Sequence, residues 1–308
     1  MARKKDSTAA GFVQIQGRWR FEGSKATYLG PDERGSPVGV CLSPSRFRTG
    51  LVKVRATIND PKAAARVVLG YNAATGSYYS VGLGGYDFAY VSDLFAEGRG
   101  WSALQARGAV SQLVTGKPYD VEVELRGQRV GLTIDGVRVL DDTFPSPLQG
   151  DQAGVFAWGT KEVLFEGFYI SGSEPQVFVV MQFGEPYDSL YKEVVRPVCS
   201  KLGFKAFRAN DVFRPGVILQ DIRRGIVEAD VIIAEITPAN PNVFYELGYA
   251  HALDKPTILL ANRHTEKLPF DISGYRVIFY DDTIRGKRDI EATLEQHLDS
   301  IRKGRSVV

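Results

Sequence analysis

The residue pattern changes once along the 308-residue chain, near Ser171–Gln176, and this change limits the possible folds more than any other feature. Before it, apolar and polar residues alternate in short segments separated by Gly, Asn or Pro, such as LVKVRATI at 51–58. Short alternating segments at regular spacing are typical of antiparallel sheets that pack face to face. We therefore predict an all-β sandwich over residues 11–172, with a disordered N-terminus at 1–10 and a linker at 173–176.

After the change, apolar strand-like segments alternate with amphipathic helix-like segments. VFVVMQF at 177–183 precedes a helical pattern at 188–203, and the same succession continues through VIIAEI at 231–236 to a charged final helix at 288–304. This order is typical of βα units, whose strands form a parallel sheet with helices on both faces. It predicts an α/β domain of about five strands over residues 177–303, followed by a tail at 304–308.

Composition narrows the class of protein without naming a function. Hydrophobic residues make up 44% of the chain, and 38 basic residues nearly balance 36 acidic ones, so the net charge of +2 predicts no attraction to nucleic acid or membranes. No segment resembles a signal peptide or a membrane span, so we expect a cytoplasmic protein. Only Cys41 and Cys199 are present, far apart, which fits a reducing compartment and predicts no metal site.

The stretch PNVFYELGYAHALDKP at 241–256 places a carboxylate, Glu246, among apolar residues. It follows an apolar strand, so Asn240 is expected to cap a helix that begins at Pro241, at the carboxyl edge of the sheet. At 100° per residue, Glu246 falls on the side of the helix that faces the sheet. The sequence leaves two interpretations open: a ligand site at the strand ends, or a Glu held by the helix dipole or a buried Arg.

A resemblance favours the first interpretation. The stretches VFVVMQFGEPYDSLYKEVVRPV, FRANDVFRPGVILQDIRRGI and ADVIIAEITPANPNVFYELGYAHALDKPTILL resemble the nucleoside 2-deoxyribosyltransferase-like family, a neighbour of the Toll/interleukin-receptor (TIR) domains, over roughly residues 176–282. The resemblance implies a flavodoxin-like sheet, Glu246 as the nucleophile and Asp221 as the residue that handles sugar or base protons. The transferases often carry Asp where this chain has Asn240.

We expect the remaining substrate contacts at the same edge of the sheet. Arginine can hold phosphates with paired hydrogen bonds, whereas solvation or an ion pair explains each arginine taken alone more readily. The substrate-binding candidates are Asn240, Asn242, Met181, Phe183, Arg208, Arg214 and Arg224.

The N-terminal part resembles a concanavalin A-like jelly-roll of the laminin-G or glucanase type, on the stretches YDVEVELRGQRVGLTIDGVRVL and AGVFAWGTKEVLFEGFYI. Glu122 and Glu124 alternate on one strand face, where we expect a solvated surface and not a glycosidase pair. Aromatic residues of this part are expected in packing or, as the alternative, along a concave binding face: Tyr78, Tyr79, Tyr86, Phe88, Tyr90 and Trp101.

These observations predict an enzyme that cleaves the N-glycosidic bond of NAD or a related nucleotide, an antiphage defence effector controlled by the β-sandwich. It needs no cofactor, because NAD or the nucleotide is the substrate, and no P-loop or GxGxxG motif follows a strand. Expected partners are a second copy of the chain and a glycan or phage-derived trigger at the sandwich, with neither membrane nor nucleic acid. The alternatives are a nucleotide receptor that does not cleave, and a carbohydrate-binding protein with a regulatory α/β domain.

Overall fold

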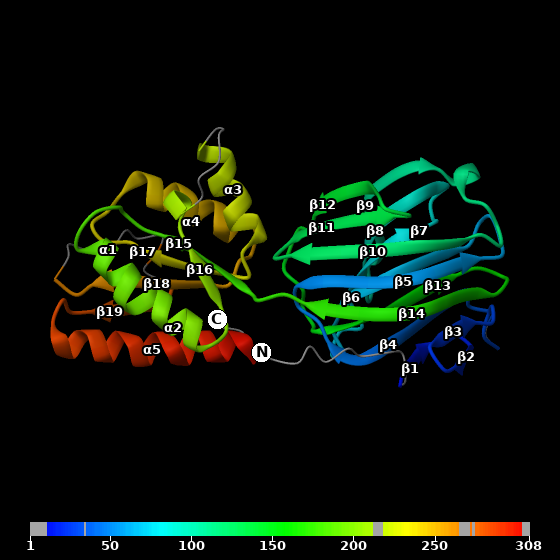
Figure 1. Ribbon diagram of the computed structural model, residues 1–308, viewed down its shortest axis with the longest axis horizontal. Helices are drawn as coiled ribbons and strands as arrows, with labels where there is room; N and C mark the ends of the chain where they lie inside the picture. Colours follow the sequence, from blue (N-terminus) through cyan, green and yellow to red (C-terminus); the bar gives the residue numbers. More distant parts are fainter. Residues whose placement is uncertain (1–10, 34, 212–217, 265–271, 273–274, 304–308) are drawn as a thin grey trace. The chain divides into compact units, whose positions relative to one another are not determined.

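The computed structural model describes residues 11–33, 35–211, 218–264, 272 and 275–303. The chain folds into two compact units. The first contains most residues up to Ser173, and the second begins at Glu174 (Figure 1). The expected N-terminal disorder at 1–10 and the tail at 304–308 lie outside the described residues.

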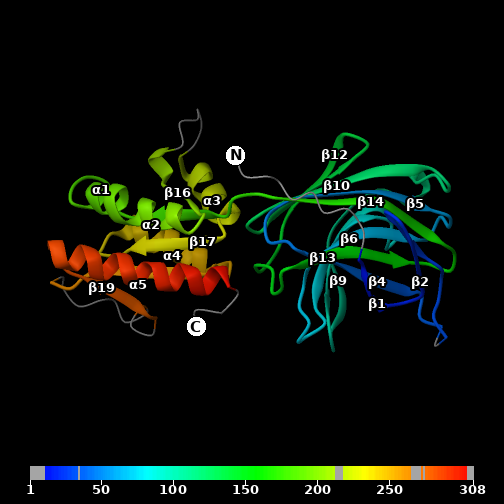
Figure 2. The same cartoon turned by 60° about the horizontal axis from the view of Figure 1, so that its bottom comes forward.

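The first unit is a β-sandwich of two seven-stranded sheets among the described residues, and Figure 2 shows the sheets as separate layers. In order, the first sheet contains β1 (Val13–Gln16), β4 (Val38–Arg46), β13 (Gln152–Trp158), β6 (Ala64–Tyr71), β7 (Tyr78–Leu83), β8 (Phe88–Ala96) and β9 (Gly100–Ala109). The second contains β12 (Val137–Thr143), β11 (Arg129–Ile134), β10 (Pro118–Arg126), β5 (Gly50–Ile58), β14 (Val163–Gly172), β3 (Lys25–Tyr28) and β2 (Trp19–Glu22). The predicted all-β sandwich is confirmed, and its form is jelly-roll-like.

The alternation seen in the sequence explains how the strands face the core. In β5, Val52, Val54, Ala56 and Ile58 are buried between the sheets, whereas Arg55 between them is exposed. In β7, Tyr79 faces the core and stacks on Phe144 with ring centroids 3.9 Å apart. The inter-sheet core therefore uses every second residue, as strand geometry requires.

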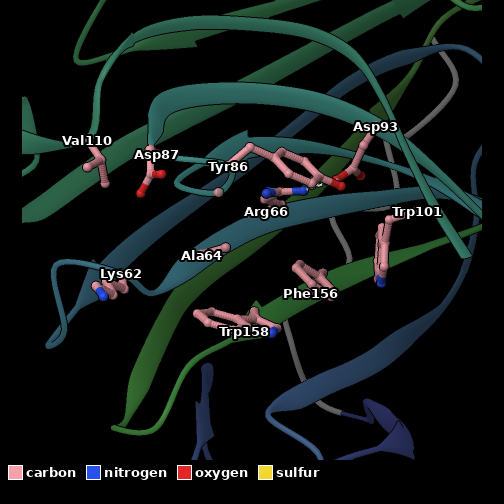
Figure 3. A pocket seen from close by; sticks show the side chains of 11 residues that line it. Lys62, Ala64, Arg66, Tyr86, Asp87, Asp93, Trp101, Val110, Phe156 and Trp158 are labelled. Atoms are coloured by element: carbon pink, nitrogen blue, oxygen red, sulfur yellow. Dashed lines mark hydrogen bonds and ion pairs between the residues drawn. The ribbon is translucent and has the colours of Figure 1, made fainter.

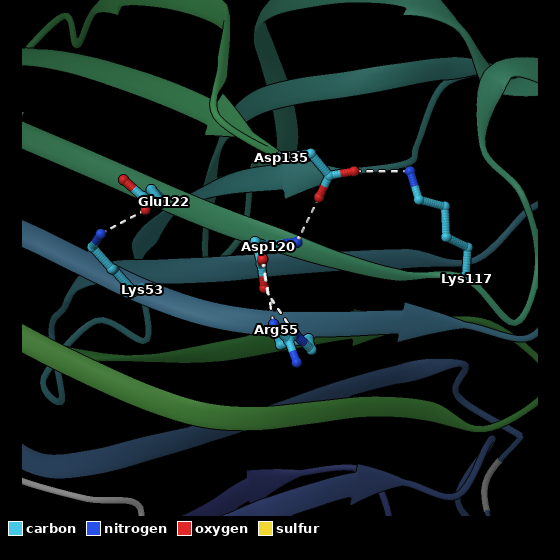
Figure 4. A network of polar contacts seen from close by, with 6 residues as sticks. All are labelled: Lys53, Arg55, Lys117, Asp120, Glu122 and Asp135. Carbon is cyan, nitrogen blue, oxygen red and sulfur yellow. Dashed lines mark hydrogen bonds and ion pairs between the residues drawn. The ribbon is translucent and has the colours of Figure 1, made fainter.

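The outer face of the second sheet carries ion pairs between neighbouring strands (Figure 4). Lys53 pairs with Glu122, and Arg55 pairs with Asp120 at 2.8 Å. Glu124 of β10 lies 3.6 Å from Arg138 of β12, which is two strands away. Opposite charges across adjacent strands favour one register, so Glu122 and Glu124 belong to a paired, solvated surface.

The second unit contains a parallel five-stranded sheet among its described residues, in the order β16 (Lys205–Phe207), β15 (Gln176–Val180), β17 (Val231–Glu235), β18 (Thr257–Asn262) and β19 (Val277–Tyr280). The helices are α1 (Tyr187–Leu190), which continues through a π-helical turn into α2 (Arg196–Lys201), and α3 (Ile218–Glu228), α4 (Pro241–Ala252) and α5 (Ile284–Arg302). The predicted parallel sheet with helices is confirmed.

Helices cover both faces of this sheet (Figures 1 and 2). Val177 and Val179 of β15 pack in one apolar cluster with Leu294 of α5. Phe178 and Val180 point to the other face, where they join Ile226 of α3 and Leu247 of α4. The central strands are therefore buried on both faces, which is why they read as continuous apolar runs.

The strand order reverses direction between β15 and β17. From β15 the chain crosses through α1 and α2 to β16 at the sheet edge, and it returns through α3 to β17 on the other side of β15. The loops that follow β15 and β17 therefore leave the carboxyl edge toward opposite faces of the sheet. Open α/β sheets bind ligands in the crevice at such a switch point.

Candidate functional site

A hydrogen bond joins the two loops at the switch point. Asn240 caps α4, because its side-chain oxygen accepts a hydrogen bond from the Asn242 backbone N–H at 2.9 Å, and Pro241 occupies the first turn. The Asn240 amide nitrogen donates to the Gln182 side-chain oxygen at 3.5 Å, in the loop after β15. The predicted cap is confirmed, and the same side chain contacts the loop after β15.

Glu246 is a half-buried carboxylate in the second turn of α4. It forms no hydrogen bond or ion pair with any described residue, and burial raises its pKa from 4.5 to about 7. The helix dipole acts within the first turn only, so neither the dipole nor a buried arginine among the described residues accounts for this side chain. Its ionisation is balanced near neutral pH, as general acids and bases require.

Asp221 lies on α3, which packs beside α4 on the same face of the sheet. The guanidinium of Arg223 on α3 lies 5.3 Å from the ring centroid of Tyr249 on α4, and this contact ties the two helices together. Asp221 is half-buried and forms no ion pair with another described residue. The structure thus places the two predicted catalytic carboxylates on adjacent helices.

Arg208 is buried, with 4% of its surface exposed, in contrast to the expected phosphate-binding position on the surface. Its Nη1 donates to Asp188 Oδ1 at 2.7 Å, and its guanidinium lies 4.2 Å from the ring centroid of Tyr191 and 5.5 Å from that of Phe183. Arg208 therefore forms an ion pair, the alternative role expected for it from the sequence. The contact with Phe183 connects Arg208 to the loop after β15.

The other predicted substrate contacts differ in their surroundings. Met181 is buried, with 5% of its surface exposed, in an apolar cluster of the second unit. It is therefore a core residue and not the substrate contact that we expected. Phe183 is 52% exposed within the loop after β15, and Asn242 and Arg224 are exposed on α4 and α3. Arg214 lies outside the described residues.

Glu235, at the carboxyl end of β17, is a site residue that the sequence interpretation missed. It is 1% exposed and accepts hydrogen bonds from the Thr237 backbone N–H at 3.1 Å and from the Tyr280 hydroxyl at 3.2 Å. Burial raises its pKa from 4.5 to about 7. The sequence feature that indicates this residue is a single Glu within the otherwise apolar segment VIIAEI.

The burial of Glu235 predicts how the free energy of unfolding depends on pH. Its raised pKa means that the folded chain holds this proton more tightly than the unfolded chain, so the folded state loses stability as pH rises from 4.5 through about 7. We expect Glu235→Gln to remove most of this loss, which is on the order of 3 kcal/mol. Urea unfolding followed by helical circular dichroism at pH 5 and pH 8 measures it, and an equal pH dependence of both proteins would contradict the assignment.

In the part of the chain that the structure describes, no group of three or more His, Cys, Asp or Glu side chains could hold a metal ion. None of the helices in this part has the length and apolar character needed to cross a membrane.

No protein-family model matches the chain, and no curated protein matches it either. Among solved structures, the carbohydrate-binding module CBM66 from Bacillus subtilis is 17% identical, covers 51% of this chain and 93% of that chain, and has a TM-score of 0.42. The Caenorhabditis elegans galectin LEC-6 is 13% identical, with coverages of 47% and 95% and a TM-score of 0.34. A Bacillus subtilis protein of unknown function with a galectin-like fold is 11% identical, with coverages of 52% and 89% and a TM-score of 0.39. At such identities and scores these similarities carry no conclusion about function.

Proposed function

We propose that the second unit cleaves the N-glycosidic bond of NAD or a related nucleotide, with Glu246 acting on the anomeric carbon. The observation that carries the proposal is the state of Glu246: a half-buried carboxylate without a polar partner among the described residues, with a pKa raised to about 7. It lies on the helix that begins at the switch point. The resemblance of residues 176–282 to nucleoside 2-deoxyribosyltransferase-like and TIR-like domains supports the same role, as does the flavodoxin-like strand order.

The chemistry suits these side chains. When the bond between the anomeric carbon and the nicotinamide nitrogen breaks, its electron pair moves to the nitrogen and neutralises the pyridinium charge, so this leaving group needs no proton. The carbon becomes cationic, and the Glu246 carboxylate stabilises it or forms an ester that water then hydrolyses. Asp221 would bind a sugar hydroxyl, or protonate a base that leaves uncharged.

In this proposal the β-sandwich controls the enzyme. Unrestrained cleavage of NAD would be toxic to the cell that makes the protein, which fits an antiphage effector that a trigger activates. The proposal includes self-association of the chain, because related transfer enzymes complete their sites between subunits.

Base release by the purified full-length chain tests the proposal. NAD, NADP, nucleosides and deoxynucleosides are incubated separately with the protein, and released base is measured by chromatography. We expect release from at least one of them, with a rate that rises as pH increases through about 7, because Glu246 acts in its ionised form. A rate that falls over this range would argue against Glu246 as the nucleophile.

A receptor that binds a nucleotide without cleaving it is the second candidate. It is favoured by Asn240, which stands where the transferases often carry Asp and whose amide already serves the helix cap and Gln182. Calorimetry that shows binding of a nucleotide, combined with chromatography that shows the same nucleotide intact, would support the receptor.

A further inference from the structure

A pocket of about 360 Å³ opens on the outer face of the first sheet, away from the core of the sandwich (Figure 3). Arg66 of β6 lies on its floor, and the aromatic side chains around it are Tyr86, Trp101, Phe156 and Trp158. Pockets for small molecules are mainly apolar, contain a few placed polar groups and measure roughly 300–1,000 Å³. This pocket fits that description at its small end.

A buried ion pair forms the floor of the pocket. Arg66 is 4% exposed and Asp93 is fully buried, and Arg66 Nη1 donates to the Asp93 carboxylate. Ser80 donates its hydroxyl to the same carboxylate, and Tyr86 does so at 3.3 Å. Arg66 Nε donates to the Gly84 carbonyl oxygen at 3.0 Å. The floor is thus polar but electrically neutral.

The turn between β7 and β8 is shaped around the Arg66 guanidinium. A Cβ atom on Gly85 would lie 1.9 Å from Arg66 Nη2, so a side chain there would displace the guanidinium. The next two residues, Tyr86 and Asp87, adopt left-handed backbone conformations with φ of 52° and 63°. Consecutive residues of this kind cost energy and gather at functional sites, and here they place Tyr86 over the pocket.

Two aromatic side chains of the pocket are exposed to solvent and do not pack in the core between the sheets. Tyr86 is 46% exposed and Trp158 is 38% exposed, and the Trp101 ring packs against Phe156 with centroids 5.0 Å apart. Neither indole N–H donates to any described residue. Two aromatic faces and two hydrogen-bond donors are therefore available to a ligand. Of the aromatic residues expected along a binding face, Tyr86 and Trp101 line the pocket, whereas Tyr79 belongs to the core.

The charges around the pocket select the class of ligand. A cationic ligand is disfavoured, because the Arg66 guanidinium already lies 5.5 Å from the Phe156 ring centroid and 5.8 Å from that of Tyr86. An anionic ligand gains little, because Asp93 neutralises Arg66 and Asp87 on the rim offsets Lys62. A saccharide is neutral, and it combines apolar C–H faces with hydroxyl groups along its edges. We propose that this pocket binds one or two units of a neutral saccharide, stacked against Trp158 and Tyr86.

Tryptophan emission tests this proposal directly, because two of the three tryptophans line the pocket and the third, Trp19, is 9% exposed in the core. The full-length chain is titrated with neutral mono- and disaccharides of hexoses and N-acetylhexosamines, and NAD is titrated in parallel by calorimetry. We expect at least one saccharide to shift the emission saturably. Trp158→Ala should bind that saccharide at least tenfold more weakly, and Trp158→Phe should lose less because it keeps an aromatic face.

Two controls separate this site from the rest of the protein. Phe21→Ala removes an aromatic side chain of similar exposure, 42%, from the second sheet and outside the pocket, and it should bind as the wild type does. Glu246→Gln should also bind the saccharide unchanged, so failure of the proposed enzyme activity leaves this test intact. The proposal is overturned if no saccharide shifts the emission, if Trp158→Ala binds as tightly as the wild type, or if Trp158→Ala weakens binding of NAD instead.

Discussion

Glu246→Gln is expected to reduce base release by roughly 10³-fold or more, on the scale seen when an enzyme loses its nucleophile. Glutamine keeps the volume and shape of the side chain, but it carries no negative charge and cannot form the ester with the anomeric carbon. Because burial disfavours the charged carboxylate, the variant should also be at least as stable as the wild type above pH 7. Loss of activity together with unchanged or higher stability is characteristic of a catalytic residue.

Chromatography of released base and thermal unfolding measure both effects in the same samples. Glu291→Gln on α5 is a matched control, because the same substitution is made on a helix that covers the opposite face of the sheet. It should retain full activity. Full base release by a folded Glu246→Gln protein would remove Glu246 from the mechanism.

Arg66→Ala is expected to destabilise the sandwich by about 3–5 kcal/mol, because it leaves the fully buried Asp93 without its neutralising partner. The double variant Arg66→Met with Asp93→Leu should recover most of this loss, since apolar residues of similar volume often replace a buried ion pair without cost. Arg55→Ala breaks an exposed ion pair with Asp120 and should cost less than about 1 kcal/mol.

All three tryptophans belong to the first unit, so denaturant unfolding followed by their emission reports on the sandwich selectively. Comparison of the three variants separates burial of charge from loss of contacts. If Arg66→Ala costs no more than Arg55→Ala, the Arg66–Asp93 pair is not buried in solution as the structure describes.

The features predictable from the sequence are those that depend on neighbours along the chain. The alternation in β5 and the cap at Asn240 each follow from residues within one turn or one strand, and both appear in the structure as expected. The apolar run of β17 likewise predicts a central strand. The local sequence pattern therefore predicts which segments form strands and helices, and most of their succession along the chain.

The features that the sequence did not reveal depend on contacts between distant segments. Asp93 meets Ser80 and Arg66 only because the register of β6, β7 and β8 brings them together on one face. Arg208 is paired with Asp188, which lies 20 residues earlier along the chain. No spacing rule predicts such pairs, because each depends on how strands and helices pack after they form.

The Asn240 side chain has a consequence for how the candidate site responds to a ligand. One amide group both starts α4 and reaches Gln182, so the helix is anchored to a loop from a different βα unit. A molecule that displaced Gln182 would break one of the two hydrogen bonds of this amide and leave the bond that caps α4 in place. Glu246 lies six residues further along the same helix. In the proposed enzyme, a change in the loop after β15 would therefore reach the helix of Glu246 through a single side chain, Asn240.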